Sequence, residues 1–159
     1  MARNPLFSRT QPGGLFNIVD VINHPGDIFF VHSGTGTDGA GYGQNPDAPL
    51  ATVDYAVGLC TASKNDVIYV MPGHAESFLA ADGFDVDISG VKIAGLGNGA
   101  NRPTFTFADT DATVAVGAAN VTLENLRFVA GLSAVVVGVN VEAAGTDCTV
   151  SNCEFYWGG

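Results

Sequence analysis

The feature that most constrains this chain is an eight-residue phrase that occurs three times. It begins at Val91, Val121 and Cys148, so that the starts are 30 and 27 residues apart. The copies read VKIAGLGN, VTLENLRF and CTVSNCEF. Each opens with alternating apolar and polar residues, which is the period of a half-buried strand. Self-similarity at such a spacing indicates a repeat architecture and is weighed before any local signal.

The alternation breaks at one position in each copy, which is Gly95, Asn125 or Asn152. Glycine and asparagine adopt the left-handed backbone conformation more easily than other residues. We therefore interpret these three residues as one-residue corners between two short strands. In a stack of coils Asn125 would lie beneath Asn152, where the side-chain amides can hydrogen-bond along the axis.

A further alternating run precedes each phrase, at residues 84–88, 114–116 and 137–141. Each coil then has three edges, and the sequence predicts an all-β chain that forms a right-handed parallel β-helix of about three coils. A β-sandwich stays open, because short strands between glycine-rich turns also suit that class. It needs no Gly or Asn corner at matching positions. The predicted inward residues are Val86, Ile88, Val91, Ile93, Leu96, Val114, Val116, Val121, Leu123, Leu126, Phe128, Val139, Val141, Val150 and Phe155.

Residues 1–26 differ from the body, which we place at residues 27–159. They show no period, and the first fourteen hold two Pro, two Gly, two Arg and no acid. A segment of this kind is poorly ordered alone, yet a solvated tail seldom keeps so many large apolar groups. We interpret it as an extended docking arm that orders on a partner, with folding back on its own body as the alternative. The expected contact residues are Arg3, Leu6, Phe7, Arg9, Leu15, Phe16 and Ile18.

The body opens with a predicted strand at 27–32 and a glycine-rich loop at 33–44. Thr52 is a suitable N-cap for a helix over 53–62, whose apolar positions Val53, Ala56, Val57 and Cys60 follow the helical spacing. A second strand follows at 67–71. We expect the helix to cap the N-terminal end of the stack.

This order carries a family resemblance. The stretch NPDAPLAT at 45–52, the short helix, and NDVIYVMPGHAE at 65–76 resemble the opening segment of pectate-lyase-like parallel β-helix proteins. The chain departs from that pattern at Asn65, where the family usually has Gly, and at His74 and Ala75, where it often has a small residue and Tyr. Residues 27–155 are covered. The whole chain also resembles β-helix proteins of tailed phages and marine viruses, which implies a place in a virion.

Charge limits the class of partner. Sixteen acidic and six basic residues give a net charge of −10, and the bases form no stripe. Nucleic acid is therefore not an expected partner, because phosphate binding requires a basic face. No apolar run is long enough to cross a bilayer, and the N-terminus lacks the apolar core of a signal peptide. We expect no membrane partner and a virion location, after assembly in the host cytoplasm.

Two groups of side chains suggest chemistry. Asp85 and Asp87 lie two apart on a predicted strand and face outward, as does Lys92. Paired carboxylates can bind Ca²⁺ or serve as the acid and base of a glycosidase, but solvated surface acids are commoner and also hinder strand aggregation. His74 and Glu76 form a second pair, for which a satisfied structural turn is the favoured interpretation. No motif indicates a metal or a cofactor, and we expect neither.

The cysteines and the last residues complete the candidate sites. Cys60, Cys148 and Cys153 are odd in number and have no metal-binding spacing, so we expect buried free thiols. The apolar residues Phe155, Tyr156 and Trp157 follow the third corner, where the stack has no cap. Because an open coil exposes core side chains and unpaired backbone, we expect another subunit, or further chain, to cover this end.

These observations favour a non-enzymatic structural component of a phage-like virion, either a capsid decoration (cement) protein or a tail-associated protein. Its partners would be a major capsid or tail protein and further copies of itself, as a homotrimer. The alternative is a carbohydrate-active β-helix, a polysaccharide lyase or hydrolase resembling a tailspike. A bacterial surface adhesin is a third hypothesis, which would call for a secretion signal.

Overall fold

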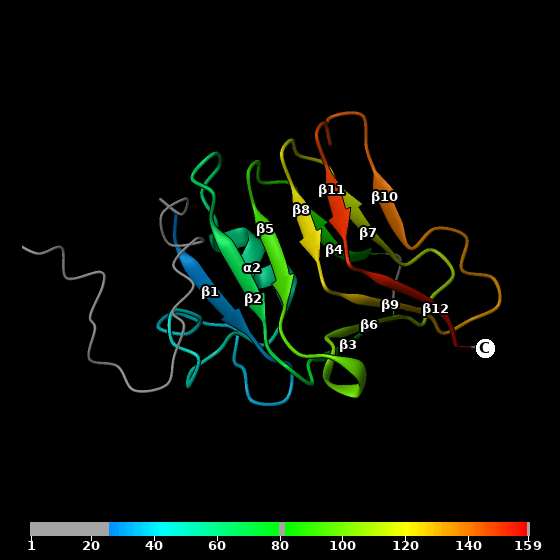
Figure 1. The fold of residues 1–159 in the computed structure, drawn as a ribbon, viewed down its shortest axis with the longest axis horizontal. Helices are drawn as coiled ribbons and strands as arrows, with labels where there is room; N and C mark the ends of the chain where they lie inside the picture. The colour runs from blue at the N-terminus through cyan, green and yellow to red at the C-terminus, as the bar shows by residue number, and fades with distance from the viewer. Residues whose placement is uncertain (1–25, 80–81, 159) are drawn as a thin grey trace, which may run out of the picture.

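The computed structural model describes residues 26–79 and 82–158, with only the backbone of residue 82 (Figure 1). One short helix precedes most of the strands. The elements are β1 (Ile28–Val31), α2 (Val53–Leu59), β2 (Val67–Val70), β3 (Ala75–Phe78), β4 (Asp82–Val86), β5 (Lys92–Gly95), the 3₁₀ turn η1 (Gly99–Asn101), β6 (Thr104–Phe107), β7 (Thr113–Val116), β8 (Thr122–Glu124), β9 (Arg127–Ala130), β10 (Val139–Val141), β11 (Thr149–Ser151) and β12 (Glu154–Trp157).

The strands form three parallel sheets, each of which runs along the stack. Their orders are β1-β2-β5-β8-β11, β4-β7-β10 and β3-β6-β9-β12. Strands β2, β3 and β4 make one coil, β5 to β7 the next and β8 to β10 the third, while β11 and β12 begin a fourth (Figure 1). The predicted parallel β-helix is confirmed, and the sandwich alternative is wrong because every paired strand runs parallel to its neighbour.

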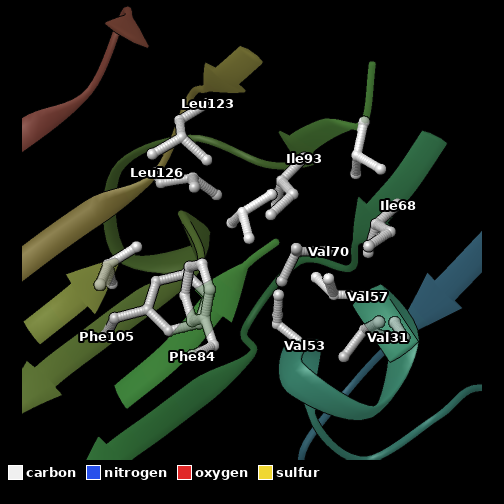
Figure 2. Close-up of a cluster of buried hydrophobic side chains, with 14 of the residues drawn as sticks. Val31, Val53, Val57, Ile68, Val70, Phe84, Ile93, Phe105, Leu123 and Leu126 are labelled. Atoms are coloured by element: carbon white, nitrogen blue, oxygen red, sulfur yellow. The ribbon is translucent and has the colours of Figure 1, made fainter. Parts of the chain in front are cut away.

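The core is a column of apolar side chains inside the coils. The register places Ile68, Ile93 and Leu123 one above another, and all three are fully buried. Phe84 and Phe105 lie on the opposite side of the column (Figure 2), with Phe84 edge-on to Phe105 at 5.2 Å between ring centroids. The buried Phe128 ring stacks on Phe105 at 5.9 Å. Of the predicted inward residues, nine are buried: Val86, Val91, Ile93, Val114, Val116, Val121, Leu123, Leu126 and Phe128.

Helix α2 closes the N-terminal end of this column. Thr52 is its N-cap, as predicted, and the Thr52 hydroxyl accepts a hydrogen bond from the Tyr55 N–H. Val53, Ala56 and Val57 form the buried face, and Val53 and Val57 point toward Val31 and Val70 (Figure 2). The helix packs against β1, β2 and β4.

The helix is shorter than predicted, because the backbone at Cys60 is already extended. Asp66 explains this early end. Its buried carboxylate accepts hydrogen bonds from the Thr61 N–H at 2.6 Å and from the Asp27 N–H at 2.7 Å, and a buried carboxylate requires such partners. The preceding residue, Asn65, has a φ of 58°, a left-handed conformation that asparagine adopts more easily than most residues.

Two of the three predicted corners are confirmed. Asn125 and Asn152 have φ values of 55° and 51°, and each lies, with one further residue, between two strands. Gly95 is not a left-handed corner. It ends β5, and a Cβ at this position would collide with the carbonyl oxygen of Asn125 on the next coil. Glycine is therefore required there for space, and the left-handed residue nearby is Gly97, with a φ of 98°.

In the loop after Gly95, Leu96 does not take its predicted inward position. This residue is 37% exposed, and not inward. Residues 96–103 form an insertion that contains η1, and the strand of this coil begins only at Thr104. The register then pairs Phe105 with Phe128, and Pro103 takes the buried position equivalent to Leu126.

The Asn125 corner yields a stability prediction. Asn125→Val should lower the free energy of unfolding by about 4–5 kcal/mol, because a β-branched residue costs roughly 1–2 kcal/mol in the left-handed region and each of the three lost side-chain hydrogen bonds costs about 1 kcal/mol. Urea unfolding followed by circular dichroism measures this change.

Two control variants separate the causes. Asn125→Gly keeps the backbone conformation and should lose only the hydrogen-bond part of the effect. Asn98→Val changes an exposed Asn whose φ is −140° and whose side chain makes no cap hydrogen bond, so it should stay within about 0.5 kcal/mol of the parent. Equal effects of Asn98→Val and Asn125→Val would contradict the corner assignment.

Candidate functional site

At the C-terminal end of the stack, the core is exposed to solvent. Strands β10, β11 and β12 pair with β7, β8 and β9 on one side, and no described strand pairs with their other side (Figure 1). We call the surface formed by these three strands the open face. Its backbone offers N–H and C=O groups to a further strand.

Inward side chains on the open face are apolar and exposed. Val150 is 41% exposed, although Leu123 beneath it is fully buried, and Phe155 is 63% exposed above the buried Phe128. Val141 is likewise exposed above a buried valine of β7. The Phe155 and Phe128 rings stack at 5.3 Å between centroids, so the other face of Phe155 remains available for contact.

A hollow of about 260 Å³ opens beside this ring. It lies where the loop 131–138, between β9 and β10, widens the third coil. Tyr156 and Trp157 are also exposed here, as expected for the predicted C-terminal contact residues. The lining is Phe107, Phe128, Ala130, Val135, Gly138, Phe155, Tyr156 and Trp157. Apolar exposure of this kind marks an interaction site.

The corner asparagines form a ladder with a direction. Asn125 donates its side-chain N–H groups to the carbonyl oxygens of Gly95 and Gly97, at 2.7 and 3.0 Å. Asn152 in turn donates to the Asn125 Oδ1 at 3.1 Å. Each amide thus donates toward the N-terminal end. At the open face Asn152 presents Oδ1, which is an acceptor.

Ion pairs on the outer surface connect the last coil to the coils before it. The Glu154 carboxylate lies 2.8 Å from the Arg127 Nε and 3.0 Å from an Arg102 guanidinium nitrogen. The hydrogen bond from Arg127, and then the positive charges of Arg102 and Arg127, lower the pKa of Glu154 below its ordinary value. Sequence analysis missed this group. The sequence does contain a signal for this group, because Arg127 and Glu154 carry opposite charges and occupy the same position in two of the repeated phrases.

The predicted acidic site is not assembled as one group. Asp85 and Asp87 are exposed and flank the buried Val86, as predicted. Lys92, however, belongs to β5 in a different sheet, and its Nζ lies 2.8 Å from the Glu124 carboxylate. The Asp85 backbone N–H donates to the Asp54 carboxylate of α2 at 3.4 Å, which links this segment to the capping helix.

His74 and Glu76 form a structural latch. The buried His74 accepts the Ser33 N–H at Nδ1, at 3.0 Å, which leaves Nε2 to donate to the Glu76 carboxylate at 3.2 Å. Glu76 also accepts the Val53 N–H at the start of α2, at 3.4 Å. The pair therefore ties the loop after β1 and the helix to the first coil, in agreement with the favoured interpretation.

The three cysteines are free thiols. Cys60 is buried, and desolvation, followed by the charges of Asp66 and Asp27, raises its pKa to about 12. Cys148 and Cys153 are half-buried against the core near the open face, and desolvation raises the pKa of each thiol.

The predicted arm residues Arg3, Leu6, Phe7, Arg9, Leu15, Phe16 and Ile18 lie outside the described residues. Within residues 26–79 and 82–158, no three or more His, Cys, Asp or Glu side chains are grouped so that they could hold a metal ion. In the same part of the chain, no helix has the length and apolar character needed to cross a membrane.

Comparison of the chain with protein-family models, with curated proteins and with solved structures found no match. The functional argument therefore depends on the geometry of the open face.

Glu154 yields a pH prediction. Because the folded state lowers this pKa, its stabilising effect is full above the ordinary value of 4.5 and is lost as the pH falls through the lower folded value. Glu154→Gln should melt at a lower temperature than the parent at pH 7, and the difference should close toward pH 3. Differential scanning calorimetry from pH 3 to 7 measures it. A difference that does not change with pH would contradict the ion-pair assignment.

The cysteines yield a reactivity prediction. A thiol with a pKa of about 12 is thiolate in only about one molecule in 10⁴ at pH 8, so Cys60 should resist a thiol-specific disulfide reagent in the folded protein. Cys148 and Cys153 should react first, and all three should react at similar rates in urea. Mass spectrometry of the labelled peptides gives the order. Cys60 reacting fastest in the folded protein would contradict the described packing.

Proposed function

We propose that this chain is a non-enzymatic structural component of a phage-like virion, as a capsid decoration (cement) protein or a tail-associated protein. The open face carries the proposal. A stack that is closed at one end and presents apolar core residues and unpaired strands at the other is suited to join a larger assembly.

The rest of the molecule supports a structural role. The acid pair Asp85 and Asp87 lies on a different sheet from Lys92, while His74 and Glu76 are occupied in holding the capped end together. The resemblance to β-helix proteins of tailed phages and marine viruses supports the virion as the place of assembly. Within it, we expect contacts with a major capsid or tail protein and with further copies of this chain as a homotrimer.

One surface feature favours the alternative, a carbohydrate-active β-helix. A hollow of about 300 Å³ lies along the five-stranded sheet, and its lining includes Tyr69, Lys92 and Glu124. An aromatic ring beside a carboxylate can bind a sugar. Asp85 and Asp87, which were predicted to line such a groove, are absent from it. Release of reducing ends from a panel of acidic and neutral polysaccharides, lost in Glu124→Gln, would support this alternative.

The assembly role predicts that the arm and the folded body are separable. Deletion of residues 1–20 should leave the body folded, as judged by circular dichroism, because β1 begins only at Ile28, but should abolish association with particles. The test compares tagged full-length and truncated chains in particle fractions of a density gradient prepared from the producing culture.

Cryo-electron microscopy of those particles provides the second readout. Density for the full-length chain at repeated, symmetry-related positions is the expected result. A full-length chain that remains monomeric and outside the particle fraction would overturn the proposed function, and a truncated chain that associates as well as the parent would overturn the role of the arm.

A further inference from the structure

We propose that residues 19–23 of a second copy add a parallel strand to β11 and so cover the open face. This inference rests on the proposed function, and it names what the N-terminal arm binds. In the docked register Val19 would lie beside Cys148, Val21 beside Val150 and Asn23 beside Asn152.

The open face specifies what can cover it. A strand that continues the sheet must run parallel to β11, as every paired strand of this sheet does. It must present apolar side chains over Cys148 and Val150, which already pack on the core or continue its column. At the corner it can donate a hydrogen bond to the Asn152 Oδ1, since one N–H of the Asn152 amide is already bonded to the Asn125 Oδ1.

Two simpler arrangements of whole bodies fail these requirements. Two copies that meet open face to open face would make the facing strands antiparallel, unlike every pair within the sheet. Stacking an open face on the capped end of another copy is blocked by α2. The outer edge of β1 is also occupied there, because Phe30 exchanges backbone hydrogen bonds with Gly43 and Leu50.

The segment 19–23 has the required pattern. It reads Val19-Asp-Val-Ile-Asn23, which repeats the apolar-x-apolar-x-Asn order of Val121 to Asn125 and of Cys148 to Asn152. The segment can therefore place two apolar side chains inward and an asparagine amide at the corner. This is the first half of the phrase that forms each corner of the stack.

The strand must come from another copy. From Asn23 to Ile28 the chain spans at most about 17 Å when fully extended. The position beyond β11 lies five strand spacings from β1, which is about 24 Å. Residues 19–23 of a chain therefore cannot occupy this position on its own open face.

Net charge favours contact between the arm as a whole and the open face, whereas Asp20 is the one charged residue of the docked segment itself. Residues 128–158 include Glu142, Asp147 and Glu154 and no Lys or Arg, whereas residues 1–22 have two Arg and one Asp. The contact joins unlike surfaces of two copies, so it continues from copy to copy until a ring closes or a filament grows. A closed ring of three would be the proposed homotrimer.

A disulfide at the docked register tests this proposal. In the full-length variant Val19→Cys, the new thiol would lie beside the native Cys148 on a neighbouring parallel strand, at a Cα separation of about 4.8 Å, which a disulfide can bridge. Mild oxidation at pH 8.5 should convert more than half of the chains into reducible dimers and larger species. Peptide mapping should locate the bond between residues 19 and 148.

Two matched variants control for chance contact. Asp20→Cys places the thiol on the outward side of the same strand and should give less than about a tenth of the cross-linked product. Val19→Cys combined with Cys148→Ser should lose the product. Positions 19 and 20 lie outside the described residues, and circular dichroism of each variant checks that the body is folded.

Light scattering on the same preparations separates the two proposals. Oligomers joined by a 19–148 disulfide support the inference, and equal cross-linking at positions 19 and 20, or a disulfide within one chain, overturns it. Oligomers that withstand deletion of residues 15–23 but are lost in Val150→Asp also overturn it, and assign the open face to a coil of another polypeptide. A chain that is monomeric and absent from particles overturns the proposed function itself.

Discussion

The stability of each coil depends on the coil beneath it. A single coil has no sheet, because all its strand hydrogen bonds run to the coils above and below. Parallel stacking in register then places like on like, so that Ile68, Ile93 and Leu123 form one column and Asn125 and Asn152 form one amide ladder. The same constraint makes the two ends of the stack special, since an end coil lacks one neighbour.

The two ends of the stack differ in structure. At the start, α2 covers the apolar column, and Asp66 and the His74–Glu76 latch satisfy buried polar groups that connect the helix, the loop after β1 and the first coil. At the other end Val150 and Phe155 continue the column into solvent. This polarity explains why we assign structural roles to the buried ionisable groups and an assembly role to the open face.

Direction is the property that would make the open face selective for the proposed strand. Backbone edges and apolar side chains alone would accept many partners, and a cap of either orientation. The amide ladder adds a direction, because Asn152 uses one N–H on Asn125 and leaves its Oδ1 as an acceptor for the proposed covering strand. A strand with inward apolar residues and an asparagine at the matching corner meets these requirements, and the chain contains one at residues 19–23.

The sequence by itself determined the fold class, because a repeated strand–Asn–strand phrase has a direct physical meaning: the left-handed corner at Asn125 and Asn152, and alternation that fixes which side chains face inward. It also determined the Thr52 cap and the outward Asp85 and Asp87. It misled at Gly95 and Leu96, since an insertion within one coil shifts the partner strand to Thr104 without disturbing the local pattern. Only the tertiary structure decided where Lys92 and Glu154 find their ion pairs, that Gly95 is needed for space, and that Val150 and Phe155 remain exposed, because burial and pairing depend on neighbouring coils that local sequence does not specify.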